Sequence, residues 1–179
     1  MIRLFVAVEL PFVLRERLGF LCAGVPGARW VATENMHLTL RFIGEVANDQ
    51  AQHIDDALAT VQAEGFAFQL DGVGFFGKPT AARVLWVGVR RCDPLIYLQR
   101  KIETALCEAG LPPESRKFSP HVTLARLRNA PGERLRRFVA ENGAFESEPV
   151  TVDRFVLYSS FRSASGPIYT PEADYPLTG

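Results

Sequence analysis

The feature that most constrains this chain is a four-residue pattern that occurs twice in matching surroundings. Residues 37–40 read HLTL and residues 121–124 read HVTL, so two copies of H-x-T-L begin 84 residues apart. Each copy lies in a strand-like run, which is followed by a helical stretch and then by a longer extended one. A unit repeated at so long an interval predicts a duplicated architecture rather than a solenoid of short repeats.

The spacing within the motif predicts which side chains share a face. In a strand, residues i and i+2 point to one side and residues i+1 and i+3 to the other. His37 and Thr39 therefore share a face, and His121 and Thr123 repeat the arrangement. If the two strands lie side by side about a pseudo-twofold axis, two imidazoles and two hydroxyls face a common cleft.

The remaining sequence alternates between helix and strand patterns. Apolar residues at helical spacing predict helices over 11–21, 48–64, 93–109 and 131–142. Runs rich in β-branched and aromatic residues predict strands over 3–8, 29–31, 36–43, 66–76, 82–89, 121–127, 149–158 and 167–177. Glycines within 66–76 suggest a bend or bulge, and 159–166 is expected to be a small-residue loop. This order predicts a mixed α+β or α/β fold.

The composition, length and net charge narrow the possible folds and functions. The 179 residues are 47% hydrophobic and 22% charged, which is enough apolar material for a core and argues against disorder. At about 150 residues per domain, this length predicts one compact unit or two small lobes that share a core. A net charge of zero argues against broad, non-specific binding of nucleic acid, so a nucleic-acid substrate would be gripped at a terminus.

Other features predict a cytoplasmic protein. The opening MIRLFVAVEL is too short for a membrane span and has no small-residue cleavage site, so we expect a buried strand. The three cysteines, Cys22, Cys92 and Cys107, form no C-x-x-C pair and are expected to be small buried residues in a reducing compartment. Nothing in the sequence argues against a monomer, which is the expectation.

Two histidines and two threonines on one face suit the hydrolysis of a cyclic phosphodiester. One histidine must deprotonate water and the other must protonate the leaving oxygen, and imidazoles titrate near neutral pH. Threonine hydroxyls can donate to the non-bridging oxygens, where charge accumulates. This chemistry needs no metal or cofactor. The third histidine, His53, lies on the polar side of a predicted helix, and Asp55 and Asp56 beside it offer too few converging ligands for a metal.

The chain resembles the two-histidine (2H) phosphoesterase superfamily, specifically the RNA 2′,3′-cyclic phosphodiesterases, also called 2′-5′ RNA ligases. The resemblance covers nearly the whole chain. It is carried by 3–8, 30–31, 34–44, 83–89, 118–126 and 166–169. It implies an α+β, two-lobed fold over 1–179 as a single domain, with pseudo-twofold related sheets, flanking helices and a central cleft. It also implies hydrolysis of a 2′,3′-cyclic phosphate terminus of RNA, or of a nucleotide, to a 2′-phosphomonoester.

The resemblance also implies roles for individual residues. His37 would be the proton donor and His121 the base that activates water, while Arg126 would hold the phosphate and Phe42 would stack near the base. Strict alternation puts Phe42 and Arg126 on the face opposite the histidines, so they reach the cleft only if their strands bulge, twist or end there. Alternation puts Arg41 on the His37 face, either as added positive potential or as a solvated charge.

Alternatives remain at this point. The same site could join RNA ends through a 2′-5′ linkage, because a catalyst accelerates both directions, or it could bind RNA ends without turnover. The intact pair of motifs argues against a pure binding module. Late in the chain, we expect one of Tyr158, Ser159, Ser160 and Tyr169 to line the cleft.

Overall fold

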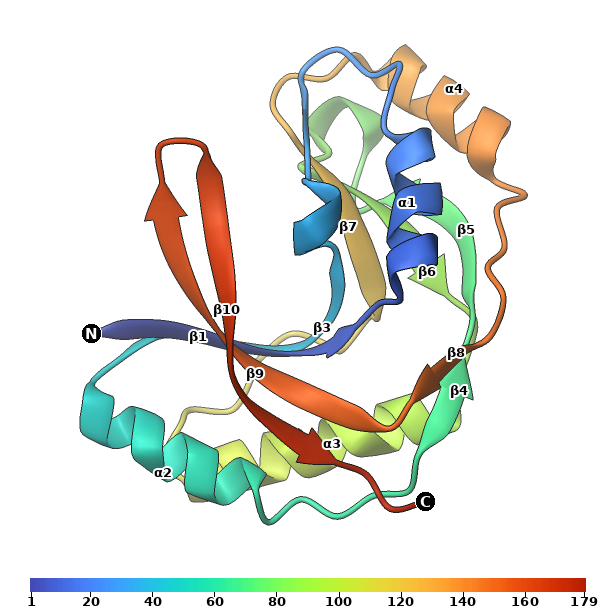
Figure 1. Cartoon of the computed structure of the whole chain (residues 1–179). Coiled ribbons are helices and arrows are strands. Elements are labelled where there is room, and N and C mark those ends of the chain that lie inside the picture. Colours follow the sequence, from blue (N-terminus) through green and yellow to red (C-terminus); the bar gives the residue numbers. More distant parts are fainter.

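The computed structural model describes residues 1–179 as an α+β fold with ten strands and four α-helices (Figure 1). The strands are β1 (Ile2–Glu9), β2 (Ala28–Trp30), β3 (His37–Val46), β4 (Phe66–Phe68), β5 (Leu70–Phe75), β6 (Val84–Val89), β7 (His121–Leu127), β8 (Val150–Val152), β9 (Arg154–Ser163) and β10 (Gly166–Pro176). The helices are α1 (Phe12–Leu21), α2 (Asn48–Leu58), α3 (Asp93–Glu108) and α4 (Gly132–Asn142), with short 3-10 turns η1 (Thr33–Asn35) and η2 (Pro79–Ala81). None of the helices is both long and apolar enough to cross a membrane.

Eight strands form one antiparallel sheet, and β4 and β8 form a separate pair. The order in the large sheet is β10-β9-β1-β3-β7-β6-β5, with β2 paired to β7. We call β10, β9, β1 and β3 the first half-sheet, and β7, β6, β5 and β2 the second. The half-sheets meet through β3 and β7, where only Leu38 and Val122 pair in register. The two H-x-T-L strands are therefore neighbours, which is the condition for a cleft common to both motifs.

Each half-sheet is covered by helices from both parts of the chain. Helices α2 and α3 lie together along the first half-sheet, whereas α1 and α4 lie beside the second (Figure 1). Helix α1 directly follows β1 yet lies by the second half-sheet, and α3 follows β6 yet packs against β3. This exchange means that neither half-sheet and its helices come from one continuous stretch of sequence.

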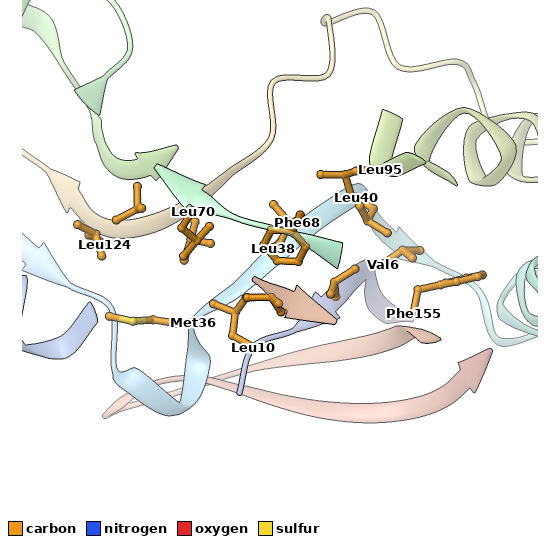
Figure 2. Packing of buried hydrophobic residues seen from close by; sticks show 14 of the residues in the cluster. Val6, Leu10, Met36, Leu38, Leu40, Phe68, Leu70, Leu95, Leu124 and Phe155 are labelled. Carbon is orange, nitrogen blue, oxygen red and sulfur yellow. The ribbon is translucent and has the colours of Figure 1, made fainter. Parts of the chain in front are cut away.

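One face of each motif strand is buried in the main hydrophobic core. Side chains from both half-sheets and several helices meet in one cluster of 37 buried residues, part of which is shown in Figure 2. The second and fourth motif positions lie within it, each at most 3% exposed: Leu38, Leu40, Val122 and Leu124. Complete burial of such a side chain stabilises the fold by about 1.5–3 kcal/mol. Burying these positions turns the histidines and threonines to the other face.

A smaller cluster lies on that other face of the first half-sheet. Phe5 and Ala7 alternate along β1 with main-core residues, and they pack with Val156 and Tyr158 of β9. Tyr169 of β10 packs against the same cluster. This second, mostly aromatic layer supports the face on which His37 lies.

Three details differ from the sequence-based expectation. The helix expected over 48–64 ends at Leu58, and Glu64 instead bridges to Thr178 near the end of the chain. The loop expected over 159–166 is largely strand, because β9 runs to Ser163 and pairs with β10 from Gly166 onward. Cross-strand pairing there overrides a composition that is typical of loops. The three cysteines are free but only partly buried, so the expectation of burial is wrong.

Candidate active site

A β-bulge directly follows the threonine of the first motif. Thr39 and Arg41 pair with consecutive residues of β1, which leaves Leu40 without a partner on that strand. One extra residue reverses the alternation of faces beyond it. Phe42 therefore turns to the face that carries His37 and lines the cleft, with 55% of its surface exposed.

The second motif has the same bulge at the same position. Thr123 and Ala125 pair with consecutive residues of β6, which leaves Leu124 without a partner. Arg126 consequently turns to the His121 face and lines the cleft. The residue five places after each histidine thus enters the cleft by the route that the sequence analysis required, a bulge in the strand.

Both histidines are oriented by the same backbone hydrogen bond. The Nδ1 atoms of His37 and His121 lie 2.7 Å from the carbonyl oxygens of Asn35 and Ser119, two residues earlier in each case. Because a carbonyl oxygen only accepts, Nδ1 carries a proton, and Nε2 is the nitrogen that remains available. Each imidazole can therefore accept a proton at Nε2 when neutral and donate one from Nε2 when cationic.

The strand register places the two imidazoles diagonally. When the register of the Leu38–Val122 pair is extended by one residue in each direction, His37 lies opposite Thr123 and Thr39 lies opposite His121. Diagonal neighbours on one face of an antiparallel pair are about 7–8 Å apart. That separation leaves room for a phosphate group between two rings that both face the cleft.

Aromatic rings surround His37. Phe5 stacks on the imidazole with 4.8 Å between ring centroids, Tyr169 meets it edge-on at 5.4 Å, and Tyr158 lies at 6.3 Å. Burial lowers the pKa of His37 to about 4, the positive charge of Arg126 lowers it as well, and the backbone hydrogen bond opposes both effects. The free protein therefore holds His37 neutral at pH 7.

His121 has a different setting. Phe76 meets its ring edge-on at 5.0 Å, and Trp86 lies at 6.3 Å. A Cβ on Gly74 would lie only 2.6 Å from the indole of Trp86, so the absence of a side chain there makes room for the indole. Burial, and secondarily the charge of Arg126, lower the pKa of His121 below its usual value.

The cleft between the motif strands, β2 and the β9–β10 hairpin has a volume of about 820 Å³. It is lined by all six residues singled out from the sequence: His37, Thr39, Phe42, His121, Thr123 and Arg126. Of the four late candidates, Ser160 and Tyr169 line it. No aspartate or glutamate lines the cleft, and nowhere in the chain do three His, Cys, Asp or Glu side chains gather in a way that could hold a metal ion. His53 is exposed on α2, as expected.

Both interpretations of Arg41, as added positive potential in the cleft and as a solvated charge, are wrong. The bulge turns it into the protein, where it is 8% exposed and its Nε donates to Glu103 of α3 at 2.6 Å. Its other nitrogens donate to the carbonyl oxygens of Phe42 and Pro112. Burial raises the pKa of Glu103, but the hydrogen bonds from Arg41 and from the backbone N–H of Glu114, together with the charge of Arg41, outweigh it, and the net shift is downward. Arg41 thus ties β3 to the segment that leads into His121.

Sequence reasoning missed the side chains that surround the histidines and three of the arginines in the cleft. The surrounding rings are Phe5, Phe76 and Trp86, and the arginines are Arg3, Arg29 and Arg162. They come from β1, the β5–β6 region, β2 and the hairpin, and all but Arg29 are distant from the motifs in sequence. The one local signal is a glycine, Gly74, that pairs with a tryptophan, Trp86, on the neighbouring strand.

An antiparallel sheet that places two H-x-T-L motifs on neighbouring strands, with both histidines in one cleft, defines a two-histidine phosphoesterase. The sequence profile of LigT-like phosphoesterases matches the chain twice, over residues 8–86 and 87–169, one match for each motif. The chain belongs to this family.

Relatives agree in sequence and in structure. The chain is 41% identical over 150 residues to an RNA 2′,3′-cyclic phosphodiesterase of Aeropyrum pernix, covering 82% of this chain and 84% of the relative. It is 38% identical over 146 residues to one of Thermotoga maritima, covering 80% and 76%. Among solved structures, Escherichia coli LigT complexed with 3′-AMP superposes with a TM-score of 0.79 at 30% identity, covering 99% of each chain. The two sequence relatives are thus RNA 2′,3′-cyclic phosphodiesterases by name.

Proposed function

We propose that this chain hydrolyses a 2′,3′-cyclic phosphate at an RNA end to a 2′-phosphomonoester, with His37 as proton donor and His121 as general base, and without a metal. The observation that carries the proposal is the pair of cleft histidines whose Nδ1 atoms are both engaged by backbone carbonyls. Each ring keeps Nε2 for proton transfer. The proposal agrees with the names of the relatives at 41% and 38% identity.

The reaction is an in-line displacement at phosphorus. His121 accepts a proton from water as the water oxygen bonds to phosphorus, and the bond from phosphorus to the ribose 3′ oxygen breaks. His37 gives its Nε2 proton to that oxygen, so the products are a free 3′ hydroxyl and a 2′-phosphate. A positioned acid and base each contribute about 10²–10⁴-fold in rate.

Charge that develops on the non-bridging oxygens needs donors. The hydroxyls of Thr39 and Thr123 share the face of the histidines and can donate to these oxygens. The guanidinium of Arg126 affects the pKa of both His37 and His121, as expected of a cation near both rings. Arg126 would bind the phosphate, because its planar fork matches two phosphate oxygens.

Substrate binding would also lead a histidine to take up from solvent the proton that catalysis requires. In the free protein both histidine pKa values are lowered, so the imidazoles are mostly neutral at pH 7. An anionic phosphate placed between them favours the cationic form of a nearby imidazole and raises its pKa. The ring of Phe42 is exposed within the cleft and offers a surface on which the base of the terminal nucleotide would stack.

The test is hydrolysis of the four nucleoside 2′,3′-cyclic monophosphates, and of an RNA oligomer with a cyclic phosphate end, in the presence of a chelator. The products are resolved into 2′- and 3′-phosphates. We expect turnover to the 2′-phosphate that the chelator does not reduce. Formation of the 3′-phosphate, or loss of activity in the chelator, would contradict the proposed mechanism, and binding without turnover would leave the site as an RNA-end binder.

A further inference from the structure

Two arginines lie side by side on one wall of the cleft. Arg29 of β2 and Arg126 of β7 are direct cross-strand partners, and both line the cleft. Like charges directly opposite each other on an antiparallel pair destabilise the sheet. Neither guanidinium has a carboxylate within 4.0 Å. The free protein therefore holds two adjacent and uncompensated cations at this wall.

The surroundings add to this positive charge. Arg3 and Arg162 also line the cleft, no acidic residue does, and the whole chain has a net charge of zero. Arg162 lies on the β9–β10 hairpin without an ion-pair partner, while Arg3 contacts Glu45. A cleft lined by one sign of charge concentrates ions of the opposite sign. This cleft suits a ligand with more than one negative charge.

The substrate of the proposed reaction accounts for only part of that charge. A 2′,3′-cyclic phosphate is a diester and carries one negative charge, which Arg126 alone would balance. A volume of about 820 Å³ is in the upper part of the range of about 300–1,000 Å³ for small-molecule sites. Both the spare cation, Arg29, and the spare volume point to a second phosphate next to the reacting one.

We propose that Arg29 binds the phosphodiester that joins the terminal nucleotide to its 5′ neighbour, so that the cleft takes the end of an RNA strand rather than a mononucleotide. This inference rests on the proposed function and adds a binding residue and a substrate length to it. The guanidinium of Arg29 donates two hydrogen bonds to one phosphodiester, and Arg126 holds the cyclic phosphate beside it.

The test compares two ligands that differ by one phosphodiester and one nucleoside. Cytidine 2′-phosphate has the reacting phosphate alone, and the dinucleotide ApC with a 2′-phosphate on the cytidine adds the 5′ linkage. Their affinities are measured by calorimetry for the wild type, Arg29→Ala and Arg100→Ala. Arg100 is exposed on α3, outside the cleft and without an ion pair, so its replacement controls for the loss of one charge.

We expect the wild type to bind the dinucleotide more tightly, and Arg29→Ala to reduce the ratio of the two affinities about tenfold or more, the effect of a charged hydrogen bond. Raising the salt concentration should weaken dinucleotide binding less steeply in Arg29→Ala, with the log–log slope smaller by about 0.7. Arg100→Ala should keep the wild-type ratio. An unchanged ratio in Arg29→Ala would overturn the proposal, whether both affinities fall equally or neither falls.

Turnover of the matching cyclic phosphates provides a second measurement. The ratio of kcat/KM for the dinucleotide to that for cytidine 2′,3′-cyclic phosphate should fall about tenfold in Arg29→Ala, in parallel with the affinities. If the wild type hydrolysed neither substrate, the proposed function would fail, and the affinities would still decide the role of Arg29. The two failures are therefore distinguishable.

Discussion

The two half-sheets carry the same motif but differ in the residues that surround it. Five residues after His37 stands Phe42, and its cross-strand partner on β1 is Phe5. Five residues after His121 stands Arg126, and its partner on β2 is Arg29. The backbone repeats itself, bulges included, but the fifth residue after the histidine is aromatic in one half-sheet and cationic in the other. The pair of motifs can therefore hold an asymmetric ligand, with Phe42 suited to a base and Arg126 suited to a phosphate.

The two histidines differ in the same way. Both share the Nδ1 hydrogen bond to a carbonyl two residues earlier, but His37 is stacked on Phe5 and enclosed by two tyrosines. Burial brings the pKa of His37 to about 4 and also lowers that of His121. Matching motifs thus acquire different surroundings from their neighbours, and both surroundings lower the histidine pKa.

The largest expected effect separates the two proton-transfer roles. A p-nitrophenyl phosphodiester has a leaving group that needs no protonation, so loss of the acid should matter little with it. We expect His37→Ala to lose about 10²–10⁴-fold in kcat on a cyclic phosphate but far less on the aryl ester. His121→Ala should lose activity on both substrates. The reverse pattern would exchange the roles of the two histidines.

The pH profile tests whether both lowered pKa values govern catalysis. The active form has one protonated and one neutral histidine, so activity rises with pH through the lower pKa and falls through the higher one. Since one pKa is about 4 and the other lies below 6.5, kcat/KM should be maximal below pH 6.5. It should fall about tenfold per pH unit on the alkaline side. The kcat optimum should lie at higher pH, because bound phosphate raises both values. A kcat/KM maximum above pH 7 would contradict this description.

The contact between Arg41 and Glu103 should matter unequally for its two partners. Arg41 has a side-chain exposure of 8% and Glu103 of 22%, so Glu103→Ala strands a buried cation. We expect Glu103→Ala to lower the free energy of unfolding by about 2 kcal/mol. Removing one partner of a fully buried pair costs more, about 3–5 kcal/mol. Arg41→Met should cost about 1 kcal/mol, because the glutamate left behind can be hydrated. Urea denaturation measures both, and equal costs would show that burial does not distinguish the partners.

The smallest effects test the surroundings of each histidine. Tyr169 and Phe76 meet His37 and His121 edge-on at 5.4 and 5.0 Å, so they form a matched pair. Removing either ring admits water, which favours the imidazolium. Tyr169→Ala should raise the pKa of His37 and leave that of His121 in place, and Phe76→Ala should do the reverse. NMR titration of the two imidazoles measures both, and a shift of both pKa values in each variant would disprove separate environments.

Local pattern predicted the part of the site that depends on local geometry. Alternation places His37 and Thr39 on one face, and the second motif repeats it, so the cleft residues of both motifs followed from the sequence. The same rule misplaced Arg41, because the bulge at Leu40 depends on the register with β1. The rings that enclose the two histidines come from segments far away in sequence. Their positions follow from the order of the strands, which no local pattern contains.

The central claim is that the two histidines act as one acid–base pair. Its most direct test is kcat for a nucleoside 2′,3′-cyclic monophosphate in the wild type, His37→Ala, His121→Ala and the double variant, with circular dichroism to verify the fold. We predict that kcat falls about 10²–10⁴-fold in each single variant. In the double variant kcat should be little lower than in the less active single variant, because the two residues act as a unit. A folded single variant with nearly wild-type kcat would contradict the account.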